Sequence, residues 1–573
     1  MFYLLHLFRS FLPMHNPIGF GAADFIALAA GLAVLLFALS ERLPKDFLRG
    51  MAERTGWCML ALFLLPIALR LLLLSIHPIP SPEVSDDFSY LLLGDTLAHF
   101  RLANPPHPLH QFFETYYVLQ QPAYGSVYPL GQGIVLAFGE LIFRNPWAGV
   151  AISVGAMCAL CYWMLRAWVA PSWALLGGLL CAIELGPLNH WINSYWGGAV
   201  SACAGCLTFG ALPRLRADPA SRWAALLGLG IGIEMLSRPY ESVFLITAVL
   251  VFLLPGWRRT IRTAPAALAV VLAASGLISL DNKSATGSWT TLPYMLSRYQ
   301  YGIPAAFTPQ PDPAPHVELT RQQQLAYQIQ SSVHDSAGKY FPRLFGRARF
   351  YRFFFLAPLY LAIPFFLLAV RELRFAWVLG TVILFALGSN FYPYFYPHYI
   401  AAIACLLILI GAVSLERLSS INSYAARIIV VFCFAHFLFW YGLHASGDPS
   451  MWRYETSDAI NYGDPAGRIA IQRELLKIPE KELVFVRYRP QHTITEWVFN
   501  SADIDHSKIV WARDLGAAEN EKLRQYYPDR KIWLLEADVH PPALEPYQEP
   551  GNQPAAIEAG HTPATPPKFE EVK

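Results

Sequence analysis

The chain has 573 residues, of which 55% are hydrophobic, 14% are aromatic and only 15% are charged, and its formal net charge at pH 7 is +2. Because about a quarter of the residues in a soluble globular protein are charged, this composition excludes an ordinary soluble enzyme. Together with repeated long apolar runs it predicts a polytopic membrane protein. A charge this close to zero also argues against a nucleic-acid partner.

The N-terminal segment predicts a retained membrane helix. Met1 to Pro13 is short and carries only Arg9 as a fixed cation. The apolar run from Ala22 to Leu39 is long enough to span a bilayer, and it ends in charged residues where a cleavable signal would have small ones.

Apolar runs then recur along the chain, and we expect about 12 transmembrane helices in total. Lys and Arg in short loops indicate the cytoplasmic side, which places the stretch from Pro80 to Gly133 and the C-terminal tail outside. Membrane crossings counted from the N-terminal end and from the C-terminal end differ by one. One candidate helix between Leu130 and Leu212 is therefore expected not to span the membrane fully. The candidate spans are Gly19–Leu39, Trp57–Ile76, Leu130–Phe143, Trp147–Val169, Trp173–Leu188, Gly197–Leu212, Trp223–Leu236, Tyr240–Leu254, Ala264–Leu280, Phe353–Val370, Phe375–Ser389, Phe395–Leu415 and Ala425–Leu443.

The sequence divides into three parts. Residues 1–443 form the predicted α-helical transmembrane domain, with outer loops at 77–129 and 281–352. Residues 444–540 have ordinary charge and alternating patterns, which predict a small extracytoplasmic α/β domain. Residues 541–573 are rich in Pro, Ala and Glu and are predicted to be disordered. The α/β domain is expected to hold strands at Leu483–Tyr488, Lys508–Ala512 and Lys531–Leu535 and a helix at Glu519–Tyr526.

The eight cysteines all lie inside apolar runs. The C-x-x-C spacings at Cys158/Cys161 and Cys203/Cys206 are compatible with metal or redox chemistry. Packing of small residues between membrane helices is the favoured interpretation.

Two adjacent carboxylates, Asp86 and Asp87, stand early in the first outer loop. One interpretation is structural, because acids after Ser85 favour the N-terminus of a helix. The other is functional, with a general base or a metal-binding pair facing the lipid surface. The two interpretations are compatible, since a capped helix would orient the acids.

A second cluster, His107, His110 and Glu114, follows a proline-rich turn in the same loop. The spacing could place three ligands for a divalent metal ion on one helical face. The favoured alternative is an amphipathic helix at the membrane surface, in which His110 and Glu114 form an ordinary pair. The sequence does not identify a cofactor, and a divalent metal ion is the candidate that these residues would suit.

Basic residues form the third group of candidates. Arg238 ends an apolar run, where an ionisable side chain is a candidate for function. Its alternatives are a structural pair with Glu234 or a cation that reaches the membrane surface. Other cations that could bind a phosphate are Arg298, Lys339, Arg343, Arg347 and His398, although surface charge is the simpler interpretation for each alone.

Four short motifs follow one another along the chain: Ser85–Tyr90 (SDDFSY), Tyr128–Gly133 (YPLGQG), Ser237–Tyr240 (SRPY) and Tyr396–Tyr399 (YPHY). These motifs and their order resemble those of the GT-C membrane glycosyltransferases, a superfamily that includes protein O-mannosyltransferases and lipid A aminoarabinose transferases. Relatives commonly carry Asp-Glu where this chain has Asp86-Asp87. The tail stretch Glu496–Asp505 resembles that of bacterial members.

The resemblance implies an enzyme of the bacterial plasma membrane with its active site outside. It would transfer a sugar from a polyprenyl-phosphate donor to a glycan, lipid or protein acceptor, with inversion, and Asp86 would activate the acceptor, assisted by Asp87. The residues expected to contact the substrates are Arg238, Arg298, Tyr128, Gln132, His398, Tyr399, Lys339 and Arg343. Two alternatives stay open: a transporter or flippase for lipid-linked sugars, and a non-catalytic membrane scaffold.

Overall fold

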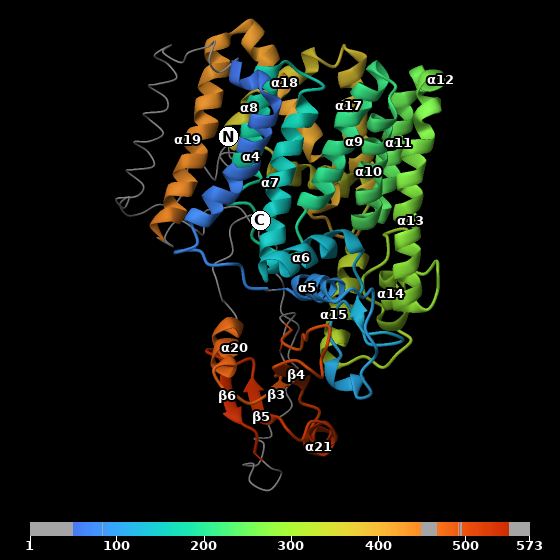
Figure 1. Cartoon of the computed structure of the whole chain (residues 1–573), viewed down its shortest axis with the longest axis vertical. Helices are drawn as coiled ribbons and strands as arrows, with labels where there is room; N and C mark the ends of the chain where they lie inside the picture. Colours follow the sequence, from blue (N-terminus) through green and yellow to red (C-terminus); the bar gives the residue numbers. More distant parts are fainter. Residues whose placement is uncertain (1–49, 83, 448–466, 491, 493–495, 549–573) are drawn as a thin grey trace.

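The computed structural model describes residues 50–82, 84–447, 467–490, 492 and 496–548. The predicted first span, Gly19–Leu39, and the end of the predicted disordered tail lie outside these residues. The described chain forms a helical bundle, drawn in the upper part of Figure 1, and a small α/β domain below it.

Most of the predicted apolar runs within the described residues form helices of the bundle. Five described helical segments are long and apolar enough to cross a membrane, and one of them, Pro239–Thr286, contains both α11 and α13. The total of about 12 spans therefore stays a prediction. The bundle helices are α4 (Thr55–Leu72), α6 (Leu130–Phe143), α7 (Pro146–Leu165), α8 (Pro171–Glu184), α9 (Ala199–Ala217), α10 (Ser221–Ser237), α11 (Pro239–Leu253), α13 (Ala264–Thr286), α17 (Leu373–Ser389), α18 (Ala404–Ile421) and α19 (Ser423–Ser446).

One predicted span was wrong as a continuous helix. The stretch predicted as Phe353–Val370 is a series of short 3-10 helices, η4 (Ala348–Phe354), η5 (Ala357–Leu361) and η6 (Ile363–Leu368). Pro358 and Pro364 lack backbone N–H donors, so an α-helical hydrogen-bond pattern cannot run through this stretch.

The cation-rich turn between α11 and α13 lies at the end of the bundle away from the α/β domain (Figure 1). It consists of η2 (Leu254–Gly256), α12 (Trp257–Thr260) and η3 (Ile261–Thr263). Arg258, Arg259 and Arg262 lie in this turn. The predicted topology places these arginines and the tail on opposite sides of the membrane, and they lie at opposite ends of the structure.

The two outer loops fold into short elements at the end of the bundle nearest the α/β domain (Figure 1). Helix α5 packs closely against α6, and a Cβ added to Gly94 would lie 2.7 Å from the Cβ of Leu136. The 3-10 helix η7 (Pro397–Ile403) leads into α18. The loop elements are α5 (Ser85–Ala98), η1 (His110–Phe113), β1 (Val118–Leu119), β2 (Gly125–Ser126), α14 (Pro293–Tyr301), α15 (Arg321–Asp335) and α16 (Tyr340–Arg347).

The C-terminal domain contains the predicted strands in a mixed sheet of order β4-β3-β5-β6. Strand β3 pairs in parallel with β4 and β5, while β6 pairs antiparallel with β5. Strand β6 corrects the prediction of disorder from residue 541, because backbone pairing with β5 orders this proline-rich segment. The elements are α20 (Arg468–Leu476), β3 (Glu482–Arg487), β4 (Ile509–Arg513), α21 (Ala517–Tyr526), β5 (Lys531–Glu536) and β6 (Ala543–Pro546).

One hydrophobic core joins this domain to the first outer loop. Phe88 and Leu92 of α5 and Phe112 of η1 pack in the same buried cluster as Leu483 and Phe485 of β3. The α/β domain is therefore packed directly on the helix that begins with the predicted acidic pair.

Candidate active site

The two acids at the start of α5 point to different surroundings. The Asp87 carboxylate is buried and accepts hydrogen bonds from the backbone N–H of Val84, at 3.5 Å, and of Tyr195, at 2.8 Å. The hydrogen bond from Val84 caps the N-terminus of α5, and the hydrogen bond from Tyr195 holds the loop between α8 and α9 in place. Asp87 therefore carries the capping role that the sequence suggested.

Asp86, in contrast, is half-buried and accepts a hydrogen bond from the hydroxyl of Tyr128. Burial raises the pKa of its carboxyl, while the Tyr128 hydrogen bond and the positive charge of Arg238 oppose that rise. A carboxylate with a raised pKa is a stronger base than a free aspartate, and its two partners still favour the ionised form.

Arg238 stands between α10 and α11, where Pro239 begins a new helix. Its guanidinium carbon lies 5.1 Å from the centre of the Tyr399 ring. Within the described part of the chain, the guanidinium has no hydrogen bond or ion pair. The predicted alternative, a structural ion pair with Glu234, is not found among the described residues, and the Glu234 carboxylate accepts a hydrogen bond from Ser201 at 2.6 Å.

Tyrosine rings line the space around Asp86 and Arg238. Tyr90 stacks on Tyr128 with ring centres 4.3 Å apart, and Tyr117 lies 5.7 Å from Tyr128. The negative charge of Asp86 also acts on Tyr394 and Tyr396. The sequence interpretation missed Tyr90, Tyr117 and Tyr394, although the aromatic run around Tyr396–Tyr399 is a signal that could have indicated such a wall.

Two other predicted residues lie close to this wall. His398 is buried, with its ring 4.9 Å from Trp196 and 5.6 Å from Tyr396. Gln132 donates from Nε2 to the carbonyl of Tyr195 at 2.8 Å. Since Asp87 accepts from the N–H of the same residue, Gln132 and Asp87 hold the backbone of Tyr195 from both sides.

The remaining predicted cations either donate to backbone carbonyls or are exposed, although the charge of Arg298 also acts on Tyr394. Arg298 donates to the carbonyls of Pro304 and Ala305, and Arg343 donates to the carbonyl of Asn390. Arg347, which is buried, donates to the carbonyl of Ser389. These guanidiniums hold backbone segments in place. Lys339 is exposed at the start of α16.

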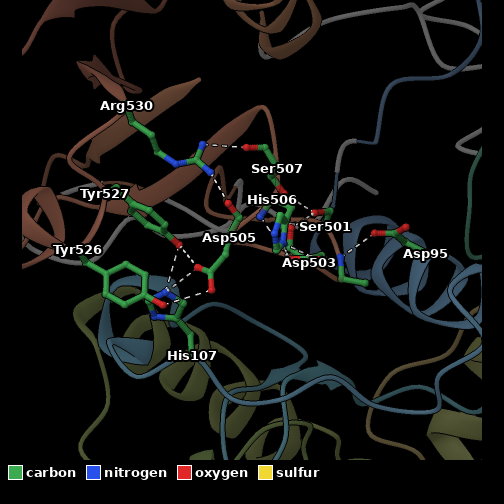
Figure 2. Close-up of polar contacts among 11 residues, drawn as sticks. Asp95, His107, Ser501, Asp503, Asp505, His506, Ser507, Tyr526, Tyr527 and Arg530 are labelled. Atoms are coloured by element: carbon green, nitrogen blue, oxygen red, sulfur yellow. Dashed lines mark hydrogen bonds and ion pairs between the residues drawn. The ribbon is translucent and has the colours of Figure 1, made fainter. Parts of the chain in front are cut away.

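The predicted metal cluster does not assemble among the described residues. His110 Nδ1 lies 3.4 Å from Glu114 Oε1, as the alternative interpretation expected. Figure 2 shows His107 turned instead toward the C-terminal domain. There His107 Nε2 lies 3.1 Å from the Tyr527 hydroxyl and 3.3 Å from Asp505 Oδ1, so this histidine serves the contact between the two domains.

No protein-family model matches the sequence, and no curated protein matches it. The structure is similar to two membrane glycosyltransferases. A structure of ArnT from Cupriavidus metallidurans without ligand has 14% sequence identity and a TM-score of 0.45, covering 84% of this chain and 93% of ArnT. A second structure of that protein holds undecaprenyl phosphate, with 11% identity and a TM-score of 0.45 over the same shares of the two chains.

The structure is also similar to the oligosaccharyltransferase of Archaeoglobus fulgidus without ligand. That similarity has 11% sequence identity and a TM-score of 0.40, and it covers 84% of this chain and 69% of the oligosaccharyltransferase. All of these TM-scores lie below 0.5, and we draw no functional conclusion from the similarity.

Proposed function

We propose that this protein is a membrane glycosyltransferase that moves a sugar from a polyprenyl-phosphate donor to an acceptor hydroxyl at the extracytoplasmic surface of a bacterial plasma membrane. Asp86 is the general base, and Arg238 binds the phosphate that leaves. The observation that carries this proposal is that one tyrosine-lined site holds both a carboxylate whose pKa is raised by burial and a guanidinium that makes no hydrogen bond or ion pair with the described residues.

The proposed reaction uses the two residues at opposite ends of the transfer. Asp86 takes the proton of the acceptor hydroxyl as its oxygen forms a bond to the anomeric carbon. The bond between that carbon and the phosphate oxygen breaks, and the electron pair stays on the phosphate. Arg238 stabilises the charge that develops there, because a guanidinium pairs bidentately with phosphate oxygens.

The surrounding residues support this assignment by holding the geometry. The Tyr128 hydroxyl orients the Asp86 carboxylate, and the Tyr399 ring lies beside the guanidinium of Arg238. Tyrosine rings offer flat apolar faces with a polar tip, which suits contact with a sugar and with the start of a lipid chain. Positioning of three reacting groups in line would supply much of the catalysis.

The phosphate assignment is tested by binding of undecaprenyl phosphate to the purified full chain in detergent. Arg238→Lys removes the bidentate geometry, which should cost about 1.5–3 kcal/mol and weaken binding roughly tenfold to a hundredfold. Arg222→Lys is the matched control, since Arg222 lies at the start of α10, the helix that ends just before Arg238, and is exposed and pairs with Asp218. Equal binding by Arg238→Lys and the wild type would refute the role of Arg238.

The class of reaction is tested separately, by mass spectrometry of glycans and glycolipids from a deletion strain and its parent. If the protein is a glycosyltransferase, at least one glycan or glycolipid should lack a sugar in the deletion strain that it carries in the parent. Identical profiles in the two strains would favour a scaffold. Loss of either a transferase or a transporter would leave the sugar on its lipid carrier. A transporter is distinguished by accumulation of the carrier-linked form on the cytoplasmic face, whereas loss of a transferase would leave it on the outer face.

A further inference from the structure

Three potential metal ligands meet in the second outer loop, apart from the proposed active site. Asp312 lies in the extended segment before α15, and His334 and Asp335 end that helix. Their ligand atoms all lie within 4.8 Å of one another. His334 Nδ1 is 3.2 Å from Asp312 Oδ1 and 3.7 Å from Asp335 Oδ1, so two carboxylates converge on a single ring nitrogen.

The hydrogen bond on the other side of the ring sets the tautomer of His334. Its Nε2 lies 3.4 Å from the carbonyl oxygen of Phe307, which can only accept a hydrogen bond. Nε2 therefore carries a hydrogen, and whenever the ring is neutral its Nδ1 presents a lone pair to the carboxylates. A histidine that ligates a metal typically donates its other N–H to a carbonyl or carboxylate in this way.

Burial makes this arrangement costly without a cation. The His334 side chain is 10% exposed and that of Asp312 is 21% exposed. Neither His334 Nδ1 nor Asp312 Oδ1 has a hydrogen-bond partner in the described chain. Two buried acceptors that face each other repel, so a positive charge between them is required.

We propose that Asp312, His334 and Asp335 bind a divalent metal ion, through one imidazole nitrogen and two carboxylate oxygens. A proton on Nδ1 would satisfy only one of the two carboxylates well, whereas a divalent cation contacts both and balances their charge. Zn²⁺ and Mn²⁺ suit this set of ligands. The Asp335 side chain is 80% exposed, which leaves a route from solvent and room for water as a further ligand.

The site would tie the end of α15 to the segment that carries Phe307. The ring of Phe307 lies 4.6 Å from that of Tyr240 and 5.2 Å from that of Tyr392, and Tyr392 lies 4.9 Å from Tyr399. The bound ion therefore has a structural role, holding a segment whose aromatic contacts extend to the ring beside Arg238.

The test is metal binding to the tag-free full chain in detergent, after removal of metal with EDTA. Titration calorimetry with ZnCl₂ and MnCl₂ should show a site that His334→Ala and Asp312→Asn each weaken by at least about tenfold. His316→Ala is the matched control, because His316 lies in the same loop, stacks on Tyr299 and is outside the cluster. This control should bind like the wild type.

Because Asp312→Asn is nearly isosteric, it keeps the test valid if His334→Ala fails to fold, and thermal unfolding of each metal-free variant checks that point. The proposal is overturned if the wild type binds neither ion, or if folded Asp312→Asn binds both as tightly as the wild type. Either result would mean that the cation between the two side chains is a proton. Neither result depends on whether the protein transfers a sugar.

Discussion

Phe88 of α5 and Phe499 of the C-terminal domain stack face to face, with ring centres 4.3 Å apart and an angle of 3° between the planes. Arg468 lies over the Phe88 ring at 4.6 Å, and Asp95 Oδ2 accepts a hydrogen bond from the N–H of Ala502 at 2.6 Å. The C-terminal domain therefore holds the helix whose first turn contains Asp86, so its packing and the position of the proposed base are coupled.

We predict that Phe499→Ala loosens α5. Removing a buried phenylalanine costs about 3–5 kcal/mol, and here the lost contacts are those between the two domains. Hydrogen exchange of residues 85–98 should become faster, and the rate of transfer should fall. Leu476→Ala, at an exposed position of the same domain, is the control and should change neither. Unchanged exchange in Phe499→Ala would show that the stack does not hold the helix.

We predict that Tyr128→Phe moves the acidic limb of the pH–rate profile to higher pH. The Tyr128 hydrogen bond opposes the rise in the pKa of Asp86, so its loss lets that pKa rise further. The ionised base is then lost earlier as the pH falls. Tyr116→Phe loses a hydrogen bond to the carbonyl of Gln322, away from Asp86, and should leave the profile in place. If the pH–rate profile of Tyr128→Phe matches that of the wild type, the Tyr128 hydrogen bond does not influence the pKa of the base.

We predict that Asp87→Asn and Gln132→Ala act through the same residue, Tyr195. Loss of the charge-assisted hydrogen bond from the Tyr195 N–H to Asp87 should cost about 1.5–3 kcal/mol of stability. Loss of the hydrogen bond from Gln132 to the Tyr195 carbonyl should cost about 1 kcal/mol. Since both hold one backbone segment, the double variant should lose less than the sum of the two. Thermal unfolding of the four proteins measures this coupling, and strictly additive losses would contradict it.

We predict that acid weakens the contact made by His107. Burial lowers the pKa of His107 below its ordinary 6.5, although the neighbouring Asp505 opposes this. At a pH between the lowered pKa of the folded state and the ordinary pKa of about 6.5 in the unfolded state, the unfolded state binds more protons than the folded state. Stability therefore falls as the pH drops from about 6.5 through the folded pKa. The protection of the β4 and β5 amides against hydrogen exchange, corrected for the intrinsic pH dependence of exchange, should fall over that range, and His107→Gln should remove the dependence. The same pH dependence in the variant would assign it to another group.

The sequence predicted most of the described bundle helices and the strands β3, β4 and β5, because these depend on local periodicity. The catalytic role of Asp86 and Asp87 stays a prediction. Although its place at the end of an apolar run singled out Arg238, the sequence could not set aside Arg298 and Arg343 as phosphate ligands. All three are cations near apolar segments, and only folding shows that two of them donate to backbone carbonyls. It also could not find the partner of His107, since Asp505 lies in another domain of the chain.

The central claim is that Asp86 is the base of a glycosyl transfer, and one measurement tests it most directly. Asp86→Asn keeps the size of the side chain and removes its basicity, while Asp87 continues to cap α5. Mass spectrometry of glycans and glycolipids should compare a deletion strain that expresses Asp86→Asn with one that expresses the wild type, at equal amounts in the membrane. We predict that Asp86→Asn gives the same profile as the deletion strain; restoration of the parental profile by Asp86→Asn would contradict the account.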